Sequence, residues 1–164
     1  IENLIFALTI AFMLVFFVMG FLFESIVLPF SVLFSMPHAF FGSLWALYLV
    51  GSPLDAGAMI GMVLLVGIVV NNAIVLVDYI NHLRRTEALP KIEAVLRAGE
   101  LRFRPILMTT STTVLGLLPM ALGLGEGAEI RAPMAITVIG GLIFSTVLTL
   151  VVVPVLYTVL DRGK

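Results

Sequence analysis

Three polar side chains interrupt a long apolar stretch of this sequence. Asn71 and Asn72 lie inside residues 56–77, which otherwise contain no charged or amide side chain, and Asp78 closes the stretch. Each amide carries two donors and an acceptor that must find partners away from lipid if the stretch crosses a membrane. Seven residues separate Asn71 from Asp78, close to two helical turns, so the two side chains share a face about 10 Å apart. Polar groups in such surroundings indicate a candidate functional site.

Two structural interpretations of these residues remain open. The Asp78 carboxylate can be solvated at the end of its helix, or it can pair with nearby Arg84 or Arg85. The amides of Asn71 and Asn72 can form hydrogen bonds between helices with no role in transport.

A second polar cluster is a run of five hydroxyls, residues 109–113. The run wraps more than one helical turn, so only Thr109, Thr112 and Thr113 share a face. Hydroxyls in membrane helices often donate to the carbonyl four residues earlier, and we expect this of at least two of the five. Just before the run, Arg102 and Arg104 lie at the entry to this span and precede Pro105, which we expect in the first turn of a helix, where a missing N–H costs nothing.

The elements that must position these residues are long apolar runs. Of the 164 residues, 61% are hydrophobic and only 12% are charged, which excludes an ordinary water-soluble domain. A helix that crosses the hydrocarbon core needs about 20 apolar residues. We therefore predict an all-α membrane protein, a bundle of five transmembrane helices at about 4–23, 30–50, 56–78, 105–124 and 133–160.

The basic residues predict how the bundle is oriented. Eight of the nine Lys and Arg follow the third span or the fifth, and only Arg131 lies on the opposite side. Because Lys and Arg accumulate on the cytoplasmic side, we place the N-terminus outside and the C-terminus inside. In the inner loop, apolar residues recur at helical spacing over about 90–103, which predicts an interfacial amphipathic helix on the membrane surface or, alternatively, a solvated linker helix.

Glycines predict where helices pack closely. Gly57 and Gly61 form a GxxxG pattern, Gly67 follows, and Gly140 with Gly141 interrupts the last span.

Composition and motifs argue against other classes of protein. A net charge of −1 gives no nucleic-acid footprint, and the absence of Cys excludes a thiolate metal site. The sequence has neither a second carboxylate within a span for an intramembrane aspartyl protease nor an HExxH zinc motif. We expect no enzyme activity, no metal and no cofactor.

Several segments resemble resistance-nodulation-division (RND) efflux permeases. Residues 67–78, GIVVNNAIVLVD, resemble their tenth span, and residues 102–109, RFRPILMT, with 116–119, GLLP, resemble the eleventh. The other matching segments are FES at 23–25 and LPFSV at 28–32, for the eighth and ninth spans, and GG at 140–141 with VPV at 153–155, for the twelfth.

The resemblance implies an inner-membrane, ion-driven exporter of drugs, metals or other amphiphiles, most often driven by protons. The chain would be the C-terminal transmembrane part, spans eight to twelve, and it starts without Met, as a piece of a longer protein would. Its implied partners are the N-terminal half and the periplasmic porter domain of the same transporter, further copies in a homotrimer, a periplasmic adaptor, an outer-membrane channel and membrane lipids. The alternatives are a structural membrane module, or an RND relative that assists protein or lipid export.

By the same resemblance, Asn71 lies where proton-driven drug pumps carry a Lys that faces an Asp pair, and Thr109 and Arg102 match a nearby Thr and Arg. An amide cannot compensate two buried carboxylates. We therefore expect the other half to supply one carboxylate, or a bound cation to replace the Lys. Asn71 and Asn72 would orient that carboxylate, Thr109 would line the same patch, and Arg102 with Asp78 would tune access from the inside.

Overall fold

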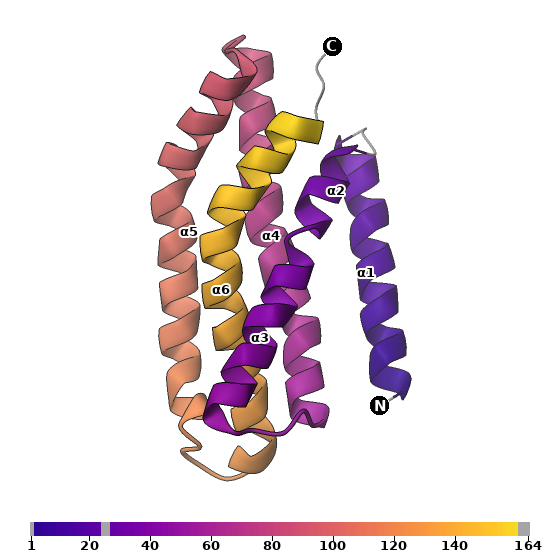
Figure 1. The fold of residues 1–164 in the computed structure, drawn as a ribbon, viewed down its shortest axis with the longest axis vertical. Helices are drawn as coiled ribbons and strands as arrows, with labels where there is room; N and C mark the ends of the chain where they lie inside the picture. Colours follow the sequence, from indigo (N-terminus) through magenta and orange to yellow (C-terminus); the bar gives the residue numbers. More distant parts are fainter. Residues whose placement is uncertain (1, 24–26, 161–164) are drawn as a thin grey trace.

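The computed structural model describes residues 2–23 and 27–160, and within these ranges it contains six helices and no strand. They are α1 (Glu2–Phe23), α2 (Val27–Leu33), α3 (Met36–Val50), α4 (Ala56–Thr86), α5 (Lys91–Ala121) and α6 (Ala128–Leu160) (Figure 1). Part of the FES segment, with Arg162 and Lys164, lies outside the described residues.

The prediction of an all-helical membrane bundle is confirmed. Among the described residues, α1, α4 and α6 are long and apolar enough to cross a membrane, and α3 is a shorter apolar helix. The helix α5 has 31 residues, but its first turns carry charged side chains. The five expected spans correspond to α1, to α2 with α3, and to α4, α5 and α6.

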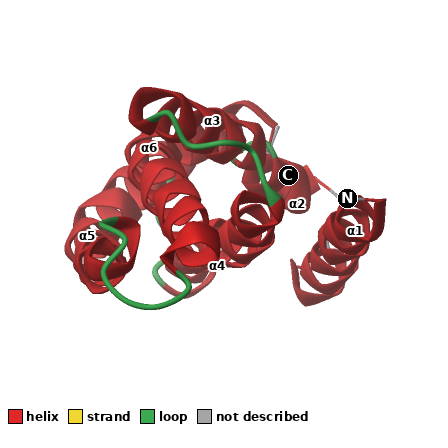
Figure 2. Ribbon diagram, turned by 90° about the horizontal axis from the view of Figure 1, so that it is seen from below, coloured by secondary structure: helices red, strands yellow, loops and turns green. Residues whose placement is uncertain are grey.

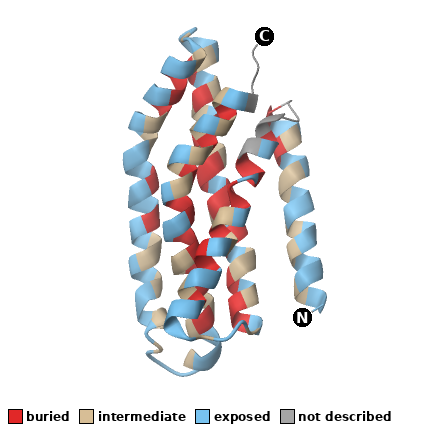
Figure 3. Ribbon diagram, viewed as in Figure 1, coloured by how far each residue is buried: buried red, intermediate tan, exposed pale blue. Residues whose placement is uncertain are grey.

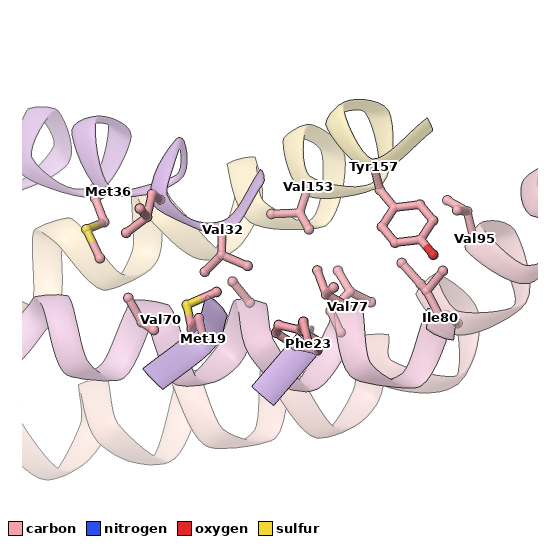
Figure 4. Close-up of a cluster of buried hydrophobic side chains, with 14 of the residues drawn as sticks. Met19, Phe23, Val32, Met36, Val70, Val77, Ile80, Val95, Val153 and Tyr157 are labelled. Atoms are coloured by element: carbon pink, nitrogen blue, oxygen red, sulfur yellow. The ribbon is translucent and has the colours of Figure 1, made fainter. Parts of the chain in front are cut away.

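The helix α6 lies at the centre of the bundle and packs against α3, α4 and α5. Seen along the bundle, α3, α4 and α5 surround α6, and α1 stands to one side (Figure 2). Buried residues accordingly gather on α6, α3 and α4, whereas only Met19 and Phe23 are buried on α1 (Figure 3). These two side chains join the main apolar cluster, which also includes Val32, Val77 and Tyr157 (Figure 4).

Glycines allow α3 and α4 to pack closely against α6. A Cβ on Gly140 would collide with the Ala46 side chain, and one on Gly141 with Leu65 and Ser43. On α4, Gly57 and Gly61 approach the backbone carbonyls of Ile130 and Met134, which are in the first turns of α6. Small residues let helix backbones approach closely in this way, so four of the five predicted packing glycines do pack within this chain.

Gly67, the fifth of these glycines, has no close neighbour in the described chain, whereas Gly42 packs closely and was not predicted to do so. Gly67 is exposed and a Cβ there would meet open space, so no helix of the described chain packs closely against it, and its packing role stays a prediction. Its face of α4 points away from α6. Gly42, by contrast, lies buried against Phe144 and the carbonyl of Gly140 at the crossing of α3 and α6.

The predicted second span, 30–50, is broken between α2 and α3. Pro37 has no N–H to donate to the carbonyl four residues earlier, and the chain turns at Phe34 and Ser35. At this turn the Val32 carbonyl accepts two hydrogen bonds, from the buried Ser35 hydroxyl at 2.6 Å and from the Ser35 N–H at 3.0 Å. The helix α3 then ends at Gly51, whose φ of 72° suits glycine.

The helix expected over 90–103 is present but is continuous with the next span, because α5 runs unbroken from Lys91 to Ala121. Pro105 is therefore inside the helix, and the prediction that it occupies the first turn is wrong. A proline here removes one hydrogen bond, whereas ending and restarting the helix would leave several backbone groups without partners at both new ends. The helix α6 likewise begins at Ala128, before Pro133.

Candidate ion-coupling site

The two candidate amides, Asn71 and Asn72, lie in the middle of α4. Asp55 caps the start of this helix, and its side chain accepts a hydrogen bond from the Ala58 N–H at 2.9 Å. The last turn carries Arg84 and Arg85, where the helix dipole favours cations. Between these ends the helix is continuous, so Asn71 and Asp78 are separated by nearly two turns. Both side chains are exposed.

These two residues belong to an exposed stripe on α4 that we call the outer face: Ile60, Leu64, Gly67, Asn71 and Asp78. The members recur three, four or seven residues apart, the spacing of one helical face. Among the described residues, no hydrogen bond is found to the side chain of Asn71 or Asp78. The outer face is therefore an exposed stripe of a membrane-crossing helix that carries two polar side chains, Asn71 and Asp78, and that the described part of the chain does not cover.

Asn72 points away from the outer face. It is buried, with 9% of its surface exposed, and its neighbours Val69, Val70 and Ala73 are buried as well. Within the part of the chain that the structure describes, its amide has no hydrogen-bond partner. The two adjacent amides thus lie on different sides of the helix, and Asn71 alone shares a face with Asp78.

Most of the hydroxyl run on α5 is satisfied inside its own helix, as expected. Thr109 donates to the Pro105 carbonyl at 3.0 Å, Thr112 to the Met108 carbonyl at 2.8 Å and Thr113 to the Thr109 carbonyl at 2.9 Å. Thr109 is exposed, and among the described residues it makes no contact with Asn71 by hydrogen bond. The candidate residue Thr109 therefore forms no joint site with the α4 amides in this part of the protein.

Within this run, the hydroxyl that joins two helices is that of Thr110, which the sequence pattern did not distinguish from its neighbours. It is buried, and its oxygen lies 3.0 Å from that of Thr146 on α6. Thr110 differs from its neighbours only in facing α6, so no signal in the run itself could have identified it.

Arg102 contacts α4 at the aromatic ring of Tyr79. Its guanidinium carbon lies 4.5 Å from the ring centroid of Tyr79, a cation–π contact. No salt bridge joins Arg102 to Asp78 among the described residues. Arg102 instead contacts the residue that follows Asp78, and the shared role of the two charges in access from the inside stays a prediction.

A buried tyrosine joins α4 and α6 at the end of the bundle where α4 ends. Tyr157 is fully buried; its hydroxyl donates to Asn81 Oδ1 at 2.6 Å and accepts from Arg84 at 3.0 Å. Lys91, at the start of α5, donates to the Thr158 carbonyl at 2.6 Å. Two of the basic residues that predicted the orientation of the chain therefore also connect helices, which their positions in sequence did not reveal.

The described residues contain no group of three or more His, Cys, Asp or Glu side chains that could hold a metal ion. The polar features that remain are amides, hydroxyls and isolated charges on the faces of membrane helices. Together with the apolar helices, these features define the class of protein as a multi-pass membrane helix bundle.

The chain matches the AcrB/AcrD/AcrF family over residues 2–161, and it belongs to that family. The resemblance to RND permeases is confirmed. Multidrug resistance protein MdtC of Erwinia tasmaniensis is 47% identical over 148 residues, which are 90% of this chain and 14% of that protein. MdtC of Erwinia amylovora is 46% identical over the same shares.

Solved structures of a heavy metal efflux pump have the same fold over most of this chain. Crystal form II aligns with a TM-score of 0.81 at 36% identity and covers 93% of this chain and 15% of that one. Crystal form I aligns with a TM-score of 0.73 at 39% identity and covers 82% and 13%. The chain thus spans about a seventh of the length of these relatives.

Proposed function

We propose that this chain is the C-terminal transmembrane part of an ion-driven RND exporter and carries half of its ion-coupling site. The observation that carries the proposal is the outer face of α4, where Asn71 and Asp78 are exposed on a helix that crosses the membrane. A polar face is costly against lipid, so it favours a partner that covers it. The open space at Gly67 leaves room for that partner's helix to approach closely.

We propose that the partner is the N-terminal half of the same transporter and that it presents one carboxylate to Asn71, or two with a bound cation. An amide can donate to an ionised carboxylate and accept from a protonated one, so Asn71 can hydrogen-bond to both forms. A change of protonation or ion occupancy would then shift α4 against its partner and produce alternating access. An intact acid pair in a purely proton-driven pump, with no other compensating charge, would contradict this part of the proposal.

The orientation and assembly belong to the same proposal. The end of α4, the start of α5 and the end of α6 meet at one end of the bundle (Figure 1), where Arg84, Arg85, Lys91 and Arg97 gather. This end would face the cytoplasm. The exporter would lie in the bacterial inner membrane as a homotrimer, with a porter domain, a periplasmic adaptor and an outer-membrane channel, and would export drugs, metals or other amphiphiles.

The test replaces Asn71 by Leu in the complete protein and measures export from cells or proteoliposomes. We expect export to be lost while the amount of assembled protein in the membrane stays the same. Asn3→Leu is the matched control, because it makes the same substitution at an exposed position at the start of α1. Retained export in the Asn71 variant would remove this residue from the coupling site, and a complete protein without ion-dependent flux would favour a structural module.

A further inference from the structure

The ring of Tyr79 lies beside two nitrogen-containing side chains where α4 meets α5. The Arg102 guanidinium carbon is 4.5 Å from the ring centroid, and the His82 ring, one turn further along α4, is stacked at 6.2 Å with an interplanar angle of 24°. Tyr79 and Arg102 are both half-buried. Among the described residues, the Tyr79 hydroxyl forms no hydrogen bond, so the face of the ring is the part that contacts Arg102.

The kind of contact matters because the tyrosine that Arg102 contacts is adjacent in sequence to a carboxylate. Asp78 directly precedes Tyr79, but it is exposed on the outer face, about 100° around the helix. A charge-assisted pair between Arg102 and Asp78 would fix both side chains and neutralise the carboxylate. A cation–π contact is weaker and leaves both charges uncompensated. The structure shows the second arrangement.

We propose that Tyr79 is a positioning residue that holds the Arg102 guanidinium between α4 and α5 and keeps it from pairing with Asp78. Arg102 then keeps a charge that Asp78 does not neutralise and responds to the ion occupancy of the coupling site, and Asp78 stays open to the other half of the transporter. This inference rests on the proposed function, because the response of Arg102 matters only if α4 carries an ion-coupling site.

The first test compares Tyr79→Leu with Tyr79→Phe in the complete, reconstituted transporter. Leu removes the π face and leaves a smaller apolar side chain, whereas Phe retains the ring and loses only the hydroxyl. We expect Tyr79→Leu to lower kcat roughly tenfold with the KM for the exported substrate unchanged, and Tyr79→Phe to rescue transport to about the wild-type rate. Equal losses in the two variants would overturn the proposal.

The second test asks whether Tyr79 acts through Arg102. In an Arg102→Gln background we expect Tyr79→Leu to cause no further loss of transport, because the residue that it positions is already gone. Fully additive losses would overturn the proposal.

A spectroscopic readout separates this inference from the proposed function. We would place 3-fluorotyrosine at position 79 of the complete protein and record its fluorine NMR signal. Arg102→Gln should shift this signal, whereas Arg104→Gln, which changes an exposed arginine two residues away, should leave it in place. An unchanged signal in the Arg102 variant would overturn the positioning role even if Asn71→Leu abolishes export, and a shifted signal in a protein without flux would leave the contact standing and contradict the proposed function.

Discussion

Polar side chains on α6 and on the outer face of α4 differ in whether this chain supplies their hydrogen-bond partners. On the packed faces of α6, Thr137, Ser145 and Thr146 are buried and each is hydrogen-bonded within the chain. On the outer face of α4, Asn71 and Asp78 are exposed, with no such partner among the described residues. The buried hydroxyls of α6 are therefore satisfied within this chain, Thr137 and Ser145 by carbonyls of α6 itself and Thr146 by Thr110 on α5, whereas Asn71 and Asp78 on α4 are not.

Glycines on α6 and on the outer face of α4 also differ in how closely other helices approach them. Gly141 lies where α6 crosses α3 and α4, with Leu65 and Ser43 in the space that a Cβ would take. Gly67, on the outer face, has open space around it. A glycine in a membrane helix thus indicates a close approach only when another helix is there to make it.

The largest effect is expected at the crossing on α6. Gly141→Leu in the complete protein should destabilise it by about 3 kcal/mol or more, because backbone and buried side chains fill the site and cannot move aside. The yield of folded protein and its thermal unfolding in detergent measure this. Gly116→Leu on α5, where a Cβ meets open space, is the control. Similar stability of the two variants would break the comparison between packed and open faces.

Gly67→Leu is expected to have the next largest effect. Within this chain the substitution meets open space, so any loss must come from a partner on the outer face. If the other half of the transporter docks there, the complete protein should lose about 1–3 kcal/mol through overpacking. Thermal unfolding of the complete protein, compared with that of Gly116→Leu, checks this. A Gly67 variant as stable as wild type would show that no helix approaches closely at this position.

Tyr157→Phe tests the polar contacts at the end of the packed side. The substitution removes the hydroxyl between Asn81 and Arg84 and should cost about 1–2 kcal/mol, because part-buried groups lose a hydrogen bond. The free energy of unfolding in mixed micelles measures the loss. Tyr48→Phe is the matched control, since that side chain is 83% exposed and should change stability by less than about 0.5 kcal/mol. Equal effects would mean that the buried hydroxyl contributes nothing to stability.

The smallest effect is expected for the hydroxyl pair between α5 and α6. Thr110→Val should cost about 0.6 kcal/mol, the average for hydrogen bonds between membrane helices. Adding Thr146→Val should cost less than the sum of the single changes, because the two residues share one bond. Thr109→Val, which removes a hydroxyl bonded within its own helix, is the control for stability. Additive losses at 110 and 146 would contradict the interhelical bond.

Much of the fold could be predicted from the sequence, because the length of an apolar run and the positions of charges are local properties. They predicted the membrane-crossing segments and the shared face of Asn71 and Asp78. They also predicted that hydroxyls such as Thr112 would bond within their own helix. The break before α3 and the continuity of α5 through Pro105 were not predicted, since a proline permits both outcomes and the packing around it decides.

Sequence periodicity assigns each residue to a face of its helix, but it does not say which helix that face meets. The sequence alone therefore determined that the polar patch lies on α4 and that glycines allow close approach. Only the tertiary structure decided that Gly67 is open while Gly42 packs, that Thr110 contacts α6, and that Arg102 meets the ring of Tyr79. The physical reason is that these contacts join residues far apart in the chain, and the way the helices cross brings them together.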